Sequence, residues 1–244
     1  MTPPVFLVDA ADLRADRVTL AGAEGRHAAA VRRLGVGERV DLSDGAGTLA
    51  ECTVLAARRD ELDLAVAVRR VVAASEPRLV VVQALAKGDR GELAVELLTE
   101  VGADEIVPWA ADRSVARWSG ERGEKALARW RSTAREAAKQ SRRAWLPDIP
   151  VMAGTDEVCD RLRGAALAIV LHGAATAPLA GVRLPTAGEV VLVVGPEGGV
   201  SEAELAAFAA AGARSLRLGR TVLRTSSAGV VAASVLLAGG PAWR

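Results

Sequence analysis

Residues 190–205, VVLVVGPEGGVSEAEL, carry the local pattern that decides the fold. The opening run of four Val and one Leu predicts a buried strand. The loop Gly195-Pro196-Glu197-Gly198-Gly199 follows directly, and Ser201 with Glu204 forms a capping box that starts a helix. This order is typical of an open α/β sheet, which binds ligands at the carboxyl ends of its strands. The same pattern also fits a tight turn with no ligand.

A second element of the same kind lies at residues 216–229, LRLGRTVLRTSSAG. It predicts a short strand, a glycine turn and a Ser-capped apolar helix. Two such loops close together in the chain favour a shared pocket. Because neither GxxxxGK[ST] nor GxGxxG is present, we expect neither a nucleoside triphosphate nor NAD in it.

The residues after Pro77 alternate compact apolar runs with helical stretches, which predicts an α/β domain with a mostly parallel, buried sheet. The first apolar run of this domain is LVVVQALA (79–86), and the helix after it is expected to be capped by Asp89 with Glu92 and to end at Gly102. One face of this helix is expected to carry Leu93, Leu97, Leu98 and Val101. A longer helix is expected from about residue 121 to 143, with a packing stripe of Leu127, Trp130, Ala134, Ala137 and Ser141.

The first seventy or so residues predict four short strands separated by turns, as in a small barrel or sandwich. The strands are expected within PVFLVDA (4–10), ERVDLSD (38–44), GTLAECTVLAARR (47–59) and ELDLAVAVRRVV (61–72). Residues 73–77, AASEP, have the composition of a linker. We therefore expect a β-domain at 1–73 and an α/β domain at 77–244.

Composition narrows the functional classes. Residues 111–147 contain ten Arg or Lys but only four Asp or Glu, although the whole chain has a net charge of +1. This local excess indicates a surface for a polyanion. Cys52 and Cys159 have no companion ligands, so we expect buried reduced thiols and no metal. No signal peptide and no apolar run long enough for a membrane are present, which predicts a cytoplasmic protein.

Five segments together resemble the RsmE family of the SPOUT superfamily, whose members methylate N3 of a uridine in small-subunit ribosomal RNA. They are RHAAAVRRLGVGERVDLSDGAG (26–47), LVVVQALAKGDRGELAVELLTEVGADEIVPW (79–109), ARWRSTAREAAKQSRRAWLP (128–147), LVVGPEGGVSEAEL (192–205) and LRLGRTVLRTSSAG (216–229). They occur in the family's order and cover nearly the whole chain.

The resemblance implies a PUA-like β-barrel at the N-terminus and a C-terminal SPOUT domain whose chain forms a deep trefoil knot, an exception to the rule against threading. It further implies a homodimer acting on 16S ribosomal RNA in the small subunit, with S-adenosylmethionine as cofactor. Matched by position, the cofactor residues would be Leu171, His172, Gly173, Gly195, Pro196, Glu197, Gly198, Gly199, Leu218, Gly219, Val222, Leu223 and Arg224.

The chemistry requires a positioned nucleophile, because N3 of uridine is weakly nucleophilic until its proton leaves. We take Arg224 as the catalytic residue that stabilises the developing anion; the alternative is a structural ion pair. Glu197 could act as a base or could cap nearby amides. Two departures from the family pattern, Ser226 for the commoner Glu and Leu97 for a frequent Lys, concern placement of the target base more than the cofactor pocket.

Cationic and polar residues of the family-like segments are the candidates for RNA contact, since such side chains bind phosphates. They are Arg26, His27, Arg32, Arg33, Arg113, Arg135, Gln140, Arg142 and Arg143. Three alternatives stay open: a SPOUT methylase of another RNA, a non-catalytic RNA-binding protein on the same scaffold, and a metabolic nucleotide-binding enzyme, which the missing phosphate motifs disfavour.

Overall fold

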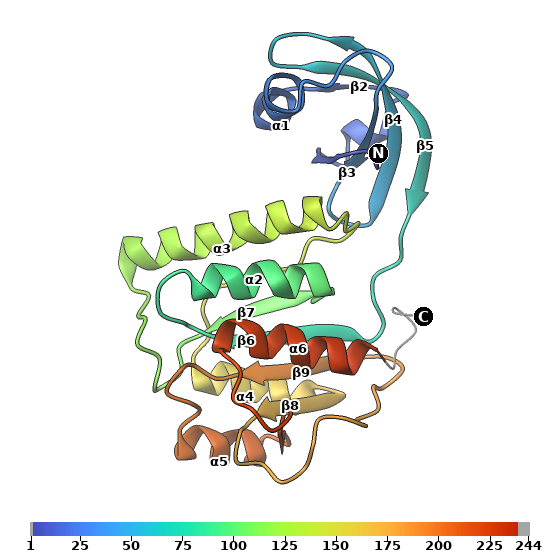
Figure 1. The fold of residues 1–244 in the computed structure, drawn as a ribbon. Helices are drawn as coiled ribbons and strands as arrows, with labels where there is room; N and C mark the ends of the chain where they lie inside the picture. Colours follow the sequence, from blue (N-terminus) through green and yellow to red (C-terminus); the bar gives the residue numbers. More distant parts are fainter. Residues whose placement is uncertain (1, 239–244) are drawn as a thin grey trace. The chain divides into compact units, whose positions relative to one another are not determined.

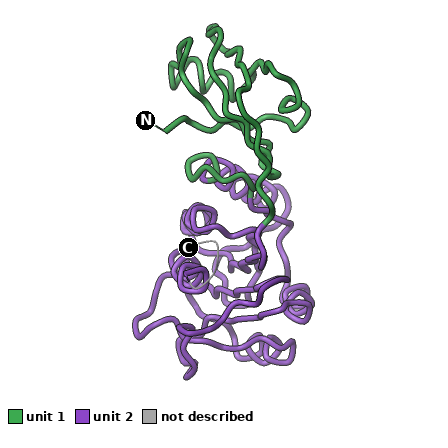
Figure 2. Tube along the Cα trace, turned by 90° about the vertical axis from the view of Figure 1, so that its right-hand side faces the viewer, with its two compact units in different colours: residues 1–74, 138–146 green, residues 75–137, 147–244 purple. Residues whose placement is uncertain are grey.

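The computed structural model describes residues 2–238, so the last six residues of the expected C-terminal domain lie outside the described part. The chain forms two compact units, which Figure 2 colours separately. One comprises the residues up to Ala74 together with Ala138–Leu146, and the other comprises Ser75–Ala137 together with the residues from Pro147 onward.

The first unit is built on a five-stranded sheet with the order β1-β3-β4-β5-β2, in which only β1 and β3 pair in parallel. Its apolar core includes Phe6, Leu42 and Leu64. The four predicted strands are present, and the structure adds one strand and three short helices that the sequence pattern did not predict. The elements are β1 (Val5–Leu7), η1 (Asp12–Arg14), β2 (Arg17–Leu20), α1 (Gly22–Arg26), the π-helix η2 (His27–Val31), β3 (Arg39–Ser43), β4 (Thr48–Ala57) and β5 (Leu62–Val71).

Residues 138–146 belong to this unit, although the sequence analysis placed them in the C-terminal domain. The backbone amide of Gly47 donates to Ala144 O at 2.9 Å, and that of Leu146 donates to Gly45 O at 2.8 Å. The indole of Trp145 donates to Val72 O at 2.9 Å, and Lys139 forms a salt bridge with Glu24 at 3.0 Å. These long-range bonds, which no local pattern predicts, fix the segment to the β-unit.

The second unit is a parallel five-stranded sheet, order β10-β8-β9-β6-β7, with helices on both faces, as predicted (Figure 1). Its elements are β6 (Arg78–Ala84), α2 (Arg90–Val101), β7 (Glu105–Trp109), α3 (Gly120–Gln140), α4 (Thr155–Gly164), β8 (Leu167–Leu171), β9 (Glu189–Val194), α5 (Glu202–Ala210), β10 (Arg214–Leu216) and α6 (Thr225–Leu237). None of the helices in residues 2–238 is long and apolar enough to cross a membrane.

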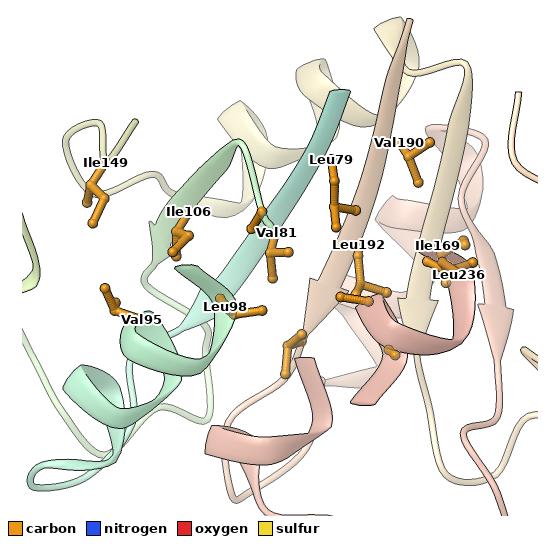
Figure 3. Packing of buried hydrophobic residues seen from close by; sticks show 14 of the residues in the cluster. Leu79, Val81, Val95, Leu98, Ile106, Ile149, Ile169, Val190, Leu192 and Leu236 are labelled. Carbon is orange, nitrogen blue, oxygen red and sulfur yellow. The ribbon is translucent and has the colours of Figure 1, made fainter. Parts of the chain in front are cut away.

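The alternation of side chains along each strand divides the apolar residues between two cores. Leu79, Val81 and Leu192 face α2, α3 and α6, and Figure 3 shows this packing with Leu98 and Leu236. On the opposite face, residues such as Val80, Val82 and Val193 pack against α4 and α5. Burial on both faces explains why these strands are continuous apolar runs.

Several helix details differ from the expectation. Asp89 precedes α2 but makes no capping hydrogen bond, because its backbone is helical (φ −81°, ψ 0°) rather than extended as a capping residue requires. Leu93 is 44% exposed, whereas Leu98 is buried and Val101 packs against the core as predicted. The buried residues of α2 are Gly91, Ala94, Val95, Leu98 and Thr99. Helix α3 ends at Gln140, which leaves Ser141 exposed and outside it.

The start of α6 also corrects a prediction. The residue before the helix is Arg224, and no side chain caps it. The hydroxyl of Thr225 donates to Gly195 O and accepts from Gln83, and that of Ser227 donates to Arg224 O, while no side chain caps the first amides of the helix.

Candidate functional site

The carboxyl ends of β8, β9 and β10 lie at one edge of the second sheet, because the strands are parallel and β8 lies between the other two. The three loops that follow them line a cavity of about 420 Å³. This volume is within the range of small-molecule sites, about 300–1,000 Å³. The loops at 171–173, 195–200 and 217–224 therefore form one site rather than three separate turns.

Twelve of the thirteen predicted cofactor residues line this cavity: Leu171, His172, Gly173, Gly195, Pro196, Glu197, Gly199, Leu218, Gly219, Val222, Leu223 and Arg224. Gly198 is not among the lining residues. A Cβ atom at Gly198 would lie 3.0 Å from Arg113 Cβ, and the Arg113 guanidinium donates to Gly198 O at 3.3 Å. Gly198 thus contacts the loop that carries Arg113.

Two glycines of the cavity have backbone conformations that favour glycine. Gly199 and Gly219 both have φ +74°, in the left-handed region. A Cβ atom on either would meet nothing within 4 Å, so both positions leave open space in which a ligand can approach the main chain. The apolar side chains of Leu171, Leu218 and Leu223 also line the cavity.

Glu197 is held by its surroundings in the charged form. Its Oε1 accepts hydrogen bonds from the Lys87 amide at 3.2 Å and from the Arg90 guanidinium at 3.0 Å. Burial raises the pKa of Glu197, but the hydrogen bonds from its own backbone, from Lys87 and from Arg90 outweigh burial and lower it overall. A carboxylate with a lowered pKa and two donors already bound is a poor proton acceptor, so the geometry favours the amide-binding role.

Arginines dominate the charge at the mouth of the cavity. Arg90 is paired with Glu197, whereas Arg217, Arg220 and Arg224 are exposed and have no carboxylate partner among residues 2–238. The alternative of a structural ion pair for Arg224 is therefore not found in this part of the chain. Unpaired guanidinium groups beside a small-molecule cavity are suited to binding an anionic second substrate.

The loop after β9 is fixed by the predicted capping box. Ser201 Oγ accepts from the Glu204 amide at 3.2 Å, and Glu204 Oε2 accepts from the Ser201 amide at 2.8 Å. The structure adds Asp112, whose amide donates to Glu204 Oε1 at 2.7 Å and whose carboxylate accepts from Ser201 Oγ at 2.8 Å. Because Glu204 is only 2% exposed, these bonds give the loop a rigid base.

The sequence analysis missed eight lining residues: Arg90, Val194, Val200, Arg217, Arg220, Thr221, Thr225 and Ala228. All but Arg90 lie within or beside the two quoted loop segments, so extending each motif to its flanking residues would have found them. Arg90 has no local signal. It reaches the cavity because β6, which precedes α2, pairs with β9.

Behind the cavity lies a buried polar side chain that the sequence analysis also missed. Gln83 of β6 is completely buried, and its Nε2 donates to Thr225 Oγ1 at 3.1 Å and to Ala84 O at 3.2 Å. Its Oε1 has no hydrogen-bond partner among the described residues. An unsatisfied buried acceptor costs about 1–3 kcal/mol, so Gln83 is not the residue that stability alone would favour.

The candidate RNA-binding residues are divided between the units. Arg26, His27, Arg32, Arg33, Gln140, Arg142 and Arg143 lie in the first unit, while Arg113 and Arg135 lie in the second. Most are exposed; His27 is half-buried, with its ring edge-on to Phe6 at 5.8 Å between centroids. Residues 138–146 thus bring the basic end of α3 into the same unit as α1 and η2.

Known protein families and relatives match almost the whole chain. The profile of an RNA methyltransferase domain family matches residues 74–237, and that of an RNA methyltransferase PUA domain matches residues 20–67. The proteins named Ribosomal RNA small subunit methyltransferase E of Mycobacterium bovis and Mycobacterium tuberculosis are each 46% identical over 237 residues, covering 95% of this chain and 90% of theirs.

Solved structures agree on the fold. A Ribosomal RNA small subunit methyltransferase E from Neisseria gonorrhoeae bound to S-adenosyl methionine is 24% identical, with a TM-score of 0.86 over 97% of both chains. A putative methyltransferase from Legionella pneumophila, in complex with the bound cofactor SAM, is 25% identical, with a TM-score of 0.85 over 98% of this chain and 99% of that one. With a PUA-like unit, a parallel α/β unit and relatives of this identity along almost its whole length, the chain belongs to the RsmE family of ribosomal RNA small subunit methyltransferases.

Proposed function

We propose that this protein transfers the methyl group of S-adenosylmethionine to N3 of one uridine in the 16S ribosomal RNA of the small ribosomal subunit. The observation that carries the proposal is the cavity at the carboxyl ends of β8, β9 and β10, with glycine-rich walls and unpaired arginines at its mouth. The mycobacterial relatives are named as small-subunit methyltransferases, and the solved Legionella relative contains SAM.

The residues that line the cavity fit this cofactor. The loops at 171–173 and 218–223 offer main-chain groups and leucine side chains, and Gly199 and Gly219 leave room beside the backbone. S-adenosylmethionine supplies an electrophilic methyl group on a sulfonium, so the protein has to hold the acceptor base in line with it. The capping box of Ser201 and Glu204 keeps the 195–200 loop in place for that purpose.

Arg224 is the residue that we assign to catalysis. It lies at the cavity, directly before α6, and is exposed without a carboxylate partner among residues 2–238. A guanidinium at that place can donate to a carbonyl oxygen of the uracil ring, on which negative charge develops as N3 loses its proton. Glu197 is not assigned as the base, because Lys87 and Arg90 already occupy its Oε1.

The RNA is proposed to bind through the exposed basic residues of both units. Arg26, Arg32 and Arg33 with His27, and Gln140, Arg142 and Arg143, would contact phosphates from the PUA-like unit, and Arg113 and Arg135 from the catalytic unit. A homodimer and a cytoplasmic location, where small subunits assemble, complete the proposal.

The decisive experiment is transfer of labelled methyl groups from S-adenosylmethionine to small subunits that lack their native base methylations, followed by nucleoside analysis. The proposal expects 3-methyluridine at a single site. Incorporation into a different nucleoside or RNA would favour another methylase, and RNA binding without any cofactor binding would favour a non-catalytic scaffold.

The role of Arg224 is tested in the same assay. Arg224→Ala should keep its affinity for S-adenosylmethionine and lose about 10²–10³-fold in kcat, the usual effect of removing one donor to a developing anion. Arg214→Ala is the matched control, because Arg214 is exposed at the amino end of β10, away from the loops of the cavity. Equal turnover of the two variants would refute the role.

A further inference from the structure

A chain of two hydrogen bonds links the interior of the sheet to the wall of the cavity. It starts at Gln83 Nε2, which donates to Thr225 Oγ1 at 3.1 Å. It continues from Thr225 Oγ1, which donates to Gly195 O at 2.8 Å. Both Thr225 and Gly195 line the cavity, whereas Gln83 is completely buried behind them.

The direction of this chain is set by the donor count. The Thr225 hydroxyl has one hydrogen, which it gives to the Gly195 carbonyl, so its oxygen is left to accept from the Gln83 amide. The Gly195 carbonyl belongs to the peptide that precedes Pro196, which has no N–H. This carbonyl is therefore the only hydrogen-bonding group of that peptide, and holding it fixes the orientation of the Gly195–Pro196 turn.

The two bonds connect segments that are far apart in sequence. Gln83 pairs with Val194 in the register of β6 and β9, so it lies beside the strand end from which the glycine-rich loop leaves. Thr225 is the first residue of α6, and the residue before it is Arg224. One buried amide thus ties together the loop after β9 and the start of the helix that follows Arg224.

The surroundings of the Gln83 side-chain amide indicate a role other than stability. Apolar side chains border the space beside Gly229 that Gln83 Oε1 faces: a Cβ atom at Gly229 would lie 3.2 Å from Leu98, 3.4 Å from Val194 and 3.6 Å from Gln83 Oε1. A Met of similar volume would avoid the unsatisfied Oε1. Residues that break a local rule of stability are concentrated at functional sites.

We propose that Gln83 is a positioning residue of the cofactor site, which acts through Thr225 to hold the Gly195–Pro196 turn in its binding conformation. The inference rests on the proposed binding of S-adenosylmethionine in this cavity. Preorganised loops bind more tightly because less freedom is lost when the ligand enters. Gln83 does not touch the ligand, so its effect is on affinity for the cofactor.

The test compares Gln83→Met and Thr225→Val with the wild type in the full chain. Calorimetric titration with S-adenosylmethionine should give a Kd raised about tenfold in each variant, which corresponds to a loss of about 1.4 kcal/mol of binding free energy. In the methylation assay the KM for the cofactor should rise by the same factor, while the KM for the small subunit stays unchanged. Thr225→Ser, which keeps the hydroxyl, should bind like the wild type.

Two further variants separate positioning from general stability. Thr99→Val is the matched control, because Thr99 is also completely buried and donates to a carbonyl, Val95 O, but lies within α2 away from the cavity. It should lower the urea midpoint and leave the Kd unchanged. The double variant Gln83→Met/Thr225→Val should bind no more weakly than Thr225→Val alone, because both changes break one chain.

The outcomes are distinct. A wild-type protein that does not bind S-adenosylmethionine refutes the proposed function, and this inference with it. A wild type that binds, with Gln83→Met binding equally well, overturns the inference alone. If Thr225→Val does not fold, Gln83→Met and Thr225→Ser still decide the result.

Discussion

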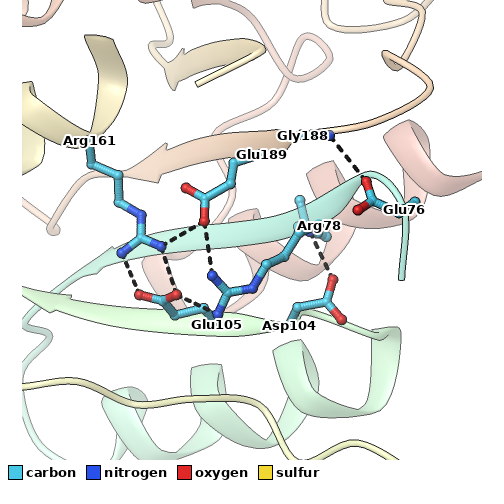
Figure 4. A network of polar contacts seen from close by, with 8 residues as sticks. Glu76, Arg78, Asp104, Glu105, Arg161, Gly188 and Glu189 are labelled. Atoms are coloured by element: carbon cyan, nitrogen blue, oxygen red, sulfur yellow. Dashed lines mark hydrogen bonds and ion pairs between the residues drawn. The ribbon is translucent and has the colours of Figure 1, made fainter. Parts of the chain in front are cut away.

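The ion-pair network at the amino ends of the strands in the second unit allows a quantitative prediction. Figure 4 shows this network, which consists of Arg78 of β6, Glu105 of β7, Arg161 of α4 and Glu189 of β9. The Glu105 side chain is 4% exposed; its Oε1 accepts from Arg161 Nη1 at 2.5 Å, and its Oε2 accepts from Arg161 Nη2 and from Arg78 Nη2, each at 2.7 Å. Arg161 also reaches Glu189 at 3.1 Å.

We predict that Arg161→Met destabilises the protein by about 3 kcal/mol. The substitution removes two charge-assisted hydrogen bonds to a buried carboxylate. Such a bond contributes about 1.5–3 kcal/mol, and we use the lower value of about 1.5 kcal/mol because the Arg161 side chain is 26% exposed. The total agrees with the lower limit of about 3–5 kcal/mol for breaking a buried pair. Arg78→Met should cost less, because it removes only one bond to Glu105 and Arg78 is 39% exposed.

Urea unfolding, followed by tryptophan fluorescence and circular dichroism together, measures the effect. With a slope of about 2 kcal/mol/M, a loss of about 3 kcal/mol moves the midpoint down by about 1.5 M. Arg163→Met is the matched control in the same helix, because Arg163 pairs with Asp160 in an exposed pair, 59% and 77% exposed, that should contribute under about 1 kcal/mol. Equal midpoints for Arg161→Met and Arg163→Met would refute the reasoning.

Three further predictions concern the cavity and the thiols. The pKa of Glu197 is lowered from its ordinary value of 4.5, so the side chain is ionised at neutral pH. The stability from its contacts with Lys87 and Arg90 is complete above pH 4.5 and is lost as the pH falls through the lowered pKa. Glu197→Gln should therefore give a rate profile between about pH 6 and about pH 9 parallel to that of the wild type; loss of the rise with pH would identify a base. Gly219→Ala should lower the free energy of unfolding by about 1–2 kcal/mol, because the φ of Gly219 is +74°, and should weaken cofactor binding. Gly164→Ala, at a position without positive φ, should change neither the urea midpoint nor the Kd measured by titration. Burial raises the pKa of Cys52 to about 11 and also raises that of Cys159, so neither thiol should react with a disulfide reagent at about pH 8 until the protein unfolds; rapid labelling of the native protein would contradict this.

The outcome of the helix predictions shows where local patterns suffice. The Ser201–Glu204 box formed as predicted, because both of its bonds lie within one turn of α5. The cap at Asp89 did not form, because the backbone there is helical, and Glu92 instead contacts Arg129 of α3 at 3.2 Å. The two motifs differ in the backbone of the capping residue: Ser201 is extended (φ −69°, ψ 158°), and its box forms although Asp112 also bonds to both side chains.

The sequence by itself determined the parallel sheet and the strand–loop–helix units, because apolar runs and glycine turns act over a few neighbouring residues. The twelve predicted residues that line the cavity came from the resemblance to the RsmE family, matched by position. Only the tertiary structure decided which loops meet, since strand order sets that. It brought Arg90 to Glu197 and Gln83 to Thr225, and it attached residues 138–146 to the β-unit through bonds to Gly45, Gly47 and Val72. These contacts join residues many positions apart, so no local pattern encodes them, and the loop-closure entropy that they cost is offset only by the packing of the whole fold.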